Sequence, residues 1–234
     1  KMKRIILTIS LALGILGANA QSIVTDRPDQ TESSSTIKGI QIESGLLIES
    51  DIYIPGTLIR LAITDNIEVR VFNQFESIKG DDKLLIGDLE IGTKIQLYQK
   101  EDAIIEMAFL SHLIVPTGSD MITNDKIGTI NKLCISHPTD NKIGVGYNIG
   151  YNYFGEGKGD ITYSVVLGFG ITDKVSLYIE PYGELANLDN SISNFNYGLT
   201  YLINNDFQLD VSSGIGLNND MSYVSFGFSW NIKK

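Results

Sequence analysis

Cysteine and histidine are scarce in this 234-residue sequence. Cys134 is the single cysteine, so no disulfide can form within the chain. His112 and His137 are the only histidines, and together with one cysteine they give no spacing typical of a metal site. No glycine-rich loop precedes a predicted helix, so a phosphate-binding cofactor is not expected either. We therefore predict neither metal nor cofactor, and a fold held together by noncovalent contacts.

Basic residues are also few. The sequence has 18 lysines and arginines against 28 aspartates and glutamates, which gives a formal net charge of −10. An acidic chain is repelled by phosphate backbones and by anionic membrane surfaces. This balance argues against nucleic acid as a partner.

Long apolar runs are missing, with one short exception at residues 5–17. This run is shorter than the roughly 20 residues that a membrane-spanning helix needs. Basic residues precede it, and Ala18-Asn19-Ala20 follows it, which is the pattern of a signal peptide with a cleavage site. We expect residues 1–20 to be a cleaved signal peptide and the chain to be exported.

No segment after Ala20 has the 3.6-residue apolar period of an amphipathic helix, whereas a period of two residues recurs throughout. In residues 222–232 the even positions are almost all apolar or aromatic, and the odd positions are mostly small and polar. The facing positions in the other strands are rich in glycine, serine and asparagine and poor in lysine. A soluble sandwich would expose such a face to water, so this composition favours a polar face enclosed within the molecule.

The connections between these alternating segments are of two kinds. Short turns are predicted at 64–66, 99–102, 139–141, 172–174 and 204–206, and mostly longer loops at 50–56, 76–83, 116–127, 155–159, 186–191 and 218–220. Tight turns at one end and longer loops at the other are typical of a transmembrane β-barrel. The predicted strands are 37–49, 57–63, 67–77, 84–98, 103–115, 128–138, 142–154, 160–171, 175–185, 192–203, 207–217 and 221–233, of which the sixth alternates poorly.

The predicted fold is all-β: a transmembrane, antiparallel, up-and-down β-barrel of about 12 strands. Hydrocarbon offers no hydrogen-bond partner to the backbone, so strands cross a membrane only within a closed sheet. The expected organisation is a signal peptide at 1–20, a periplasmic N-terminal segment at 21–36 and an outer-membrane barrel at 37–234. The predicted partners are outer-membrane lipid, the barrel assembly machinery and a small-molecule solute. Lipid-facing aromatics near strand ends are expected to form an interfacial girdle: Tyr147, Tyr151, Tyr153, Tyr163, Tyr197, Tyr201 and Trp230.

Three segments carry a family resemblance. "TDRPDQTES" at 25–33, which is followed by "KGIQIESG" at 38–45, is the most specific, and "GDLEIGTK" at 87–94 and "LIVPTGS" at 113–119 follow in order. The sequence resembles outer-membrane proteins of the putative MetA-pathway of phenol degradation family, whose members are often called transporters. This resemblance implies an outer-membrane barrel that passes small molecules, including aromatic or otherwise hydrophobic ones.

The first of these segments has two possible placements. Asp26, Arg27, Pro28 and Asp29 either fold into the barrel mouth, where Arg27 could pair with acidic residues of the lumen, or form a solvated linker on the periplasmic side. Pro28 prevents regular strand pairing at this point but does not decide between the two placements.

Residue parity predicts which charged side chains face the lumen. The acids are Glu43, Glu49, Glu68, Glu76, Asp88, Glu90, Glu106, Glu180, Glu184 and Asp210, and the basic or titratable partners are Arg60, Arg70, Lys94, Lys142 and His112. An acidic lumen would favour cations and neutral solutes. Alternatively, cross-strand ion pairs fill a narrow barrel, for instance Arg70 with Glu68 or Asp88, and Lys94 with Glu106. Tyr178 and Tyr182 alternate with Glu180 and Glu184 in a stripe that could hold an aromatic or cationic solute or could simply pack as inner wall.

These features predict a channel for passive uptake of small solutes in the outer membrane. The alternative is a closed barrel with a structural or partner-binding role. An outer-membrane phospholipase would need a serine and a histidine within hydrogen-bond reach, and neither His112 nor His137 has a serine motif at matching parity. We therefore expect no enzymatic activity.

Overall fold

The computed structural model describes residues 23–100, 103–137 and 143–232. The predicted signal peptide lies outside these residues, as does the predicted lumen residue Lys142. The described residues form thirteen strands: β1 (Ile40–Glu49), β2 (Ile52–Thr64), β3 (Ile67–Ile78), β4 (Leu84–Ile86), β5 (Leu89–Tyr98), β6 (Glu106–Val115), β7 (Gly128–His137), β8 (Ile143–Tyr153), β9 (Asp160–Gly170), β10 (Val175–Ala186), β11 (Asn190–Asn204), β12 (Phe207–Gly216) and β13 (Ser222–Ile232). In these parts of the chain no helix is long and apolar enough to cross a membrane.

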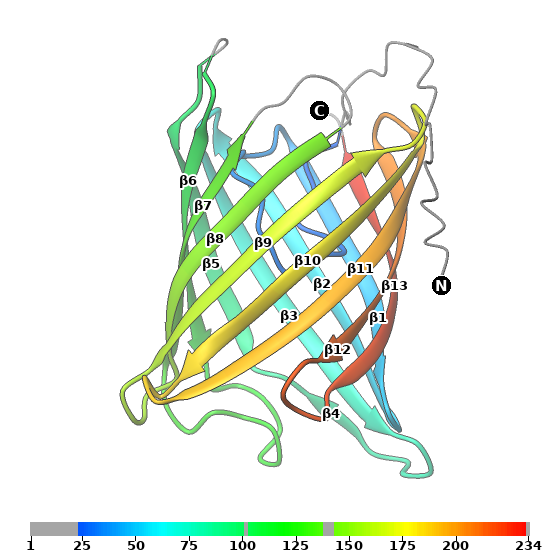
Figure 1. Ribbon diagram of the computed structural model, residues 1–234. Coiled ribbons are helices and arrows are strands. Elements are labelled where there is room, and N and C mark those ends of the chain that lie inside the picture. The colour runs from blue at the N-terminus through cyan, green and yellow to red at the C-terminus, as the bar shows by residue number, and fades with distance from the viewer. Residues whose placement is uncertain (1–22, 101–102, 138–142, 233–234) are drawn as a thin grey trace, which may run out of the picture.

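The strands form one closed antiparallel sheet (Figure 1). Apart from β4 and β5, strands that follow one another in sequence pair with each other, and β1 also pairs with β13, which closes the barrel. The short β4 and the following β5 both pair with β3 and together make one crossing, so the barrel has twelve crossings. The predicted twelve-stranded transmembrane barrel is confirmed, including its weakly alternating sixth strand, which is β7.

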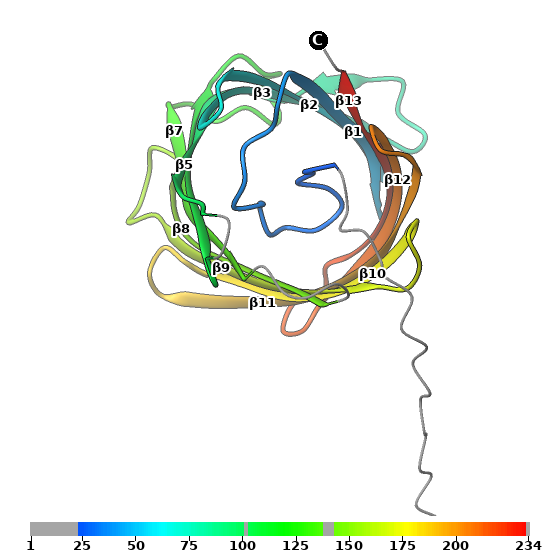
Figure 2. The same ribbon diagram turned by 90° about the horizontal axis from the view of Figure 1, so that it is seen from above.

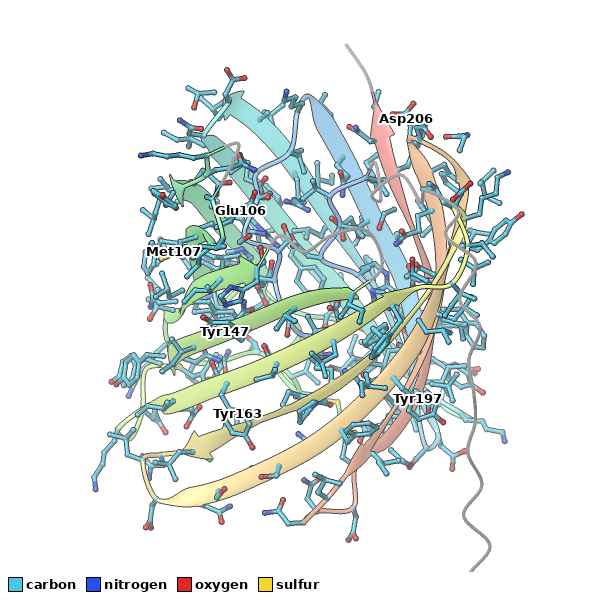
Figure 3. The ribbon with its side chains drawn as sticks, turned by 45° about the horizontal axis from the view of Figure 1, so that its top comes forward. Glu106, Met107, Tyr147, Tyr163, Tyr197 and Asp206 are labelled. Carbon is cyan, nitrogen blue, oxygen red and sulfur yellow. The ribbon has the colours of Figure 1, made fainter. Side chains whose placement is uncertain are left out.

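The two-residue period sorts side chains between the two faces of the wall. On β13, Phe226 and Trp230 are 51% and 46% exposed on the outer face, whereas Ser225 and Ser229 are buried inside. Outward aromatics of the predicted girdle include Tyr163 and Tyr197, which lie on the outer surface in Figure 3. An apolar exterior and a polar interior are what a strand needs when it crosses lipid as part of a closed sheet.

We call the two ends of the barrel the turn end and the loop end. The turn end, at the top of Figure 1, carries the connections at 65–66, 171–174 and 205–206. The loop end carries the two longest described connections, at 116–127 and 154–159. Two predicted loops at this end, 50–56 and 186–191, are shorter in the structure, at 50–51 and 187–189, where Ser50 and Asn187 take positive φ values of 53° in tight hairpins.

The described chain starts inside the barrel. Residues 23–39, which we call the N-terminal segment, precede β1 and wind through the ring of strands, as Figure 2 shows from the turn end. The first strand therefore begins at Ile40, three residues later than predicted. Of the two placements left open by the sequence, the structure shows the one within the barrel.

Candidate functional site

The N-terminal segment is held by side chains of the wall rather than by strand pairing. Its backbone N–H groups at Gln30, Thr31 and Glu32 donate to wall side chains, as do those at Thr36 and Ile37. A buried N–H without a partner would cost roughly 1–3 kcal/mol, so this segment needs polar side chains around it. The small polar residues of the inner wall therefore provide the segment's hydrogen-bond partners.

One side of the wall holds the segment by charge. Arg60 on β2, Arg70 on β3 and Lys94 on β5, which we call the cationic wall, converge on the carboxylate of Asp26. Its oxygens lie 3.0 Å from Arg60 Nη1, 2.8 Å from Arg70 Nη1 and 3.0 Å from Lys94 Nζ. The N–H of Ser33 also donates to Asp26 at 2.8 Å, and the Asp26 side chain is only 3% exposed.

Burial and charge act in opposite directions on Asp26. Burial alone would raise the pKa of its carboxyl group, but the charges of Arg60, Lys94 and Arg70 outweigh it and hold the pKa well below its usual value. Asp26 therefore stays ionised in the lumen.

Two wall glutamates complete this cluster. Arg60 pairs with Glu43 Oε1 at 2.8 Å and with Glu68 Oε1 at 2.9 Å, and all three side chains are fully buried. Buried ion pairs are costly to assemble, and they are more costly to break by removing one partner. The cluster thus fixes the segment's position strongly.

The ion pairs predicted from the sequence are mostly different in the structure. Arg70 does lie near Glu68, at 3.4 Å, but not near Asp88. Lys94 does not pair with Glu106; within the described residues it pairs with Asp26 and with Glu32 of the N-terminal segment. Strand parity correctly predicted that Arg70 and Lys94 point inward, but it could not predict that Asp26 of the N-terminal segment pairs with both.

The guanidinium of Arg27 packs directly against the backbone of two glycines in the barrel wall. Its guanidinium donates to Asp210 Oδ1 at 2.8 Å and to Ser225 Oγ at 3.2 Å. It lies against the paired glycines Gly45 of β1 and Gly227 of β13, where a Cβ atom would come within 2.4 Å and 2.3 Å of it. Only glycine leaves space for the guanidinium at these two positions.

The opposite side of the wall holds the segment with mostly neutral groups. The carboxylate of Glu180 on β10 accepts from the N–H groups of Gln30 and Thr31, at 2.9 and 2.7 Å, and from the Thr31 hydroxyl. We call this side the amide–hydroxyl wall, and its members are Ser136, Asn148, Ser164, Asn196 and the single carboxylate Glu180.

Glu32 and Ser34 extend these contacts along the segment. Asn148 exchanges two hydrogen bonds with the backbone of Glu32, at 2.7 and 3.0 Å, and Ser34 meets Ser136 at 2.5 Å. Ser35 donates to Glu106 at 3.0 Å. Glu180 lies on β10, Asn148 on β8, Ser136 on β7 and Glu106 on β6, which pairs with β5 of the cationic wall, so the contacts follow the wall from β10 round to the cationic wall.

Several of the other predicted lumen residues bond to wall or loop residues and not to the segment. Asp88 serves the loop end, where its carboxylate accepts from the N–H groups of Thr117, Gly118 and Asn124. Glu90 pairs with His112 Nδ1 at 3.0 Å. In the stripe on β10, Glu180 contacts the segment, whereas these contacts do not involve Tyr178, Tyr182 and Glu184.

Several residues that contact the segment or the lumen were missed by sequence reasoning. Lys132 of β7 lines the lumen, but its strand alternates poorly and gave no parity signal. The amides and hydroxyls of the amide–hydroxyl wall were missed because serine and asparagine are common on any inner face. The sequence feature that could have indicated them is the unusually high content of serine and asparagine on the whole inner face.

Two cavities flank the segment. The larger, of about 550 Å³, lies toward the turn end and reaches the exposed turn residues Thr172 and Asp173. The smaller, of about 340 Å³, lies toward the loop end and is lined by Arg70, Lys132 and His112 together with several apolar side chains. Gln30, in the middle of the segment, remains exposed within the lumen. The lumen is therefore partly filled by the segment and is not packed solid by wall side chains.

The family model described as "Putative MetA-pathway of phenol degradation" matches residues 25–233. The chain belongs to this family. The match begins at the first residue of the motif "TDRPDQTES", which supplies Asp26 and Arg27 to the lumen. The resemblance predicted from the sequence is confirmed.

Solved structures with this fold include outer-membrane channels. The COG4313 outer membrane channel from Pseudomonas putida F1 has a TM-score of 0.68 at 13% identity, covering 84% of this chain and 97% of that one. The KdgM porin in complex with disordered oligogalacturonate has a TM-score of 0.65 at 10% identity, covering 82% and 99%. The NanC porin has a TM-score of 0.61 at 9% identity, covering 83% and 100%. No curated protein sequence matches the chain.

Proposed function

We propose that this family member is an outer-membrane channel for passive uptake of small solutes, and that its N-terminal segment forms the constriction. The observation that carries the proposal is the content of the lumen: two cavities of about 550 and 340 Å³ lie on either side of one noncovalently bound segment. Solutes that fit such cavities are small molecules, which agrees with the predicted substrate class. The hydrophobic or aromatic nature of the solute remains an implication of the family.

The proposed location supports this role. Structural neighbours of this chain are porins and channels of outer membranes, and none of the three described above is an enzyme. We infer that the chain is exported, loses its signal peptide and inserts with the turn end in the periplasm. The larger cavity then faces the periplasm, and the loop-end cavity receives solute from outside.

The closed scaffold is the second candidate function. This function is supported by the contacts of the N-terminal segment with both the cationic wall and the amide–hydroxyl wall. If these contacts never break, the lumen does not conduct, and the barrel serves only the envelope or a partner.

Swelling of proteoliposomes separates the two functions. We expect vesicles that contain the refolded mature chain to swell in isotonic glycerol faster than in arabinose, and faster in arabinose than in sucrose. A closed scaffold predicts swelling equal to that of empty vesicles in all three solutes.

A disulfide lock tests the role of the segment itself. The hydroxyl oxygens of Ser34 on the segment and Ser136 on β7 lie 2.5 Å apart, so S34C together with S136C should form a disulfide. We expect oxidation of this pair to lower flux and reduction to restore it. Each single variant controls for pairing with Cys134. Unchanged flux in a fully oxidised sample would show that the segment is not the constriction.

A further inference from the structure

The strands of the barrel wall supply too few carboxylates to pair with all three cations of the cationic wall. Arg60 has two close wall partners, Glu43 and Glu68. The only wall acid paired with Arg70 is Glu68, at 3.4 Å, and among the described residues no wall acid pairs with Lys94. The N-terminal segment supplies the remaining carboxylate partners of Arg70 and Lys94, namely Asp26 and Glu32.

This deficit makes opening of the lumen costly. With the segment in place Arg70 is 1% exposed at its side chain and Lys94 is fully buried, so both cations depend on carboxylates of the segment for their counter-charge. A buried charge without a partner is strongly destabilising. If the segment moves away, another carboxylate or similar anion must enter for the wall to remain neutralised.

The loop-end cavity gives such an anion a place to enter. Asp26 and Arg70 both line it, so the carboxylate to be replaced is at its surface. Lys132 lines the same cavity, and its charge acts on Glu32 of the segment. Lys132 thus adds a positive charge to a lining that also carries Glu32, Glu43 and Glu90, and this charge attracts an anion toward Arg70.

Apolar side chains form another part of this cavity. Phe72, Leu110 and Ile130 line it, and Leu110 and Ile130 belong to a small apolar cluster of the inner wall that also includes Ala108 and Cys134. The volume of about 340 Å³ is enough for a one-ring molecule. A solute with a carboxylate at one end and a compact apolar body at the other matches both parts of the cavity.

We propose that Arg70 and Lys94, with Lys132 level with Lys94 on β7, form a binding site for small apolar carboxylates, and that Asp26 is its resident occupant until a solute replaces it. This inference rests on the proposed channel function and names its solute class. It predicts the opposite preference to the sequence-based expectation that an acidic lumen favours cations. The acids around the cluster are already paired, and the exchangeable group is itself a carboxylate.

Exchange of one carboxylate for another leaves the charge of the cluster unchanged. A neutral solute in place of Asp26 would leave Lys94 with Glu32 alone, at 3.4 Å, and Arg70 with Glu32 and Glu68, and a cationic solute would add a further positive charge. Solute binding and release of the segment are thus linked, because the solute binds only where Asp26 has left.

Titration calorimetry on the refolded full mature chain in detergent tests the site directly. The probes are benzoate, phenol, benzylamine and acetate. We expect benzoate to bind, acetate to bind more weakly because it lacks the apolar body, and phenol and benzylamine to give no saturable heat.

Asp26→Asn removes the charge of the competitor and keeps its shape. We expect benzoate affinity to rise by about tenfold in this variant, and added benzoate to raise its unfolding temperature more than that of the wild type. Lys132→Gln should weaken benzoate binding in the same assay. Glu156→Gln is the matched control, because this acid lies in an exposed loop pair with Lys126, and its binding curve should equal that of the wild type.

Several outcomes would overturn the inference. It is wrong if wild type and Asp26→Asn bind benzoate no better than phenol, and its apolar part is wrong if acetate binds as tightly as benzoate. A folded Lys132→Gln, shown by heat-modifiable migration in a gel, is a second test if Asp26→Asn does not fold; unchanged benzoate binding there contradicts the proposal. Vesicles that swell in neutral solutes without any carboxylate binding would leave the channel standing and reject only the site. Carboxylate binding without flux of any solute would reject the channel instead.

Discussion

The two sides of the lumen hold the same segment by different physics. The cationic wall meets Asp26 with three buried charges at 2.8–3.0 Å. The amide–hydroxyl wall meets Thr31 and its neighbours with hydrogen bonds that involve one charged group, Glu180. Water can replace a neutral hydrogen bond at little net cost, but it cannot easily solvate a buried cluster of charges.

This difference suggests an order of events. The contacts on the amide–hydroxyl wall can open and close with water as a substitute partner, so that side is expected to loosen first. The cationic wall needs a counter-charge at all times, so it anchors the segment until an anion takes the place of Asp26. The following changes test whether the two sides really differ in this way, beginning with the largest expected effect.

Arg60→Ala should cause the largest loss of stability. It leaves Glu43, Glu68 and Asp26 buried near one another without their shared cation. We expect the free energy of unfolding in lipid vesicles to fall by about 3–5 kcal/mol, measured by denaturant titration. Lys79→Ala is the matched control, since its pair with Asp51 is long at 3.9 Å and exposed, and it should change stability by less than about 0.5 kcal/mol. Equal effects of the two variants would contradict the importance of the buried cluster.

Gly227→Ala tests the seat of Arg27 without touching the cluster around Asp26. The new methyl group would lie 2.3 Å from the guanidinium and so displace it from Asp210. We expect a loss of about 2 kcal/mol in the same titration, as for other overpacked sites. Gly144→Ala is the control, because a Cβ there meets nothing within 4 Å. If the two alanine variants are equally stable, Arg27 is not held by this contact.

Thr31→Val makes the corresponding change on the amide–hydroxyl wall. It keeps the shape of the side chain and removes hydrogen bonds to Glu180 and to Ser164, the latter at 2.8 Å. Glu180 retains its bonds from two backbone N–H groups and from Asn196, so we expect a loss of only about 1.5 kcal/mol.

The same variant should conduct more readily than the wild type, because the side that loosens first is weakened. Liposome swelling in arabinose measures this effect. Thr36→Val serves as control, since its hydroxyl donates to a backbone oxygen in an exposed turn and not to the amide–hydroxyl wall. Lower flux in Thr31→Val than in this control would reverse the proposed order of opening.

The sequence was sufficient for the wall but not for its contents. Strand positions followed from the period of two residues, because each crossing must present an apolar face to lipid along its full length. The hairpin at Ser50 was missed because Pro55 and Gly56 of β2 resemble loop residues, although here they pair with Leu46 and Gly45 inside the sheet. Local composition misled where tertiary pairing decided the structure.

The cluster around Asp26 could be predicted only in part. Parity placed Arg60, Arg70 and Lys94 in the lumen, as the structure shows, yet the partners assigned to Arg70 and Lys94 were wall residues only. Their shared partner lies in a segment without periodicity, and no pattern within the wall indicates which carboxylate that segment will bring. The excess of cations over free wall acids near β3 and β5 was the signal available, and it becomes visible only once the strand register is known.

Asp29→Asn should have the smallest effect, and the effect should be stabilising at neutral pH. Burial, and then the nearby charge of Glu180, raise the pKa of Asp29 well above its usual value. A group with a raised folded-state pKa contributes stability that is fully present below its unfolded pKa of about 3.9 and is lost as pH rises through the folded value. Asparagine is neutral at every pH and avoids that loss.

We therefore expect Asp29→Asn to be roughly 1 kcal/mol more stable than the wild type at pH 7 and equally stable near pH 3.5, where Asp29 is protonated in both states. Asp26 has the opposite dependence, because its lowered pKa gives stability above about 3.9 that is lost as pH falls further. Denaturant titrations of wild type and variant between pH 3 and 8 measure the difference, with Asp173→Asn at an exposed turn as control. A stabilisation that persists unchanged at low pH would mean that the amide improves packing. In that case the buried charge of Asp29 would not be the reason why the wild type is less stable than the variant at pH 7.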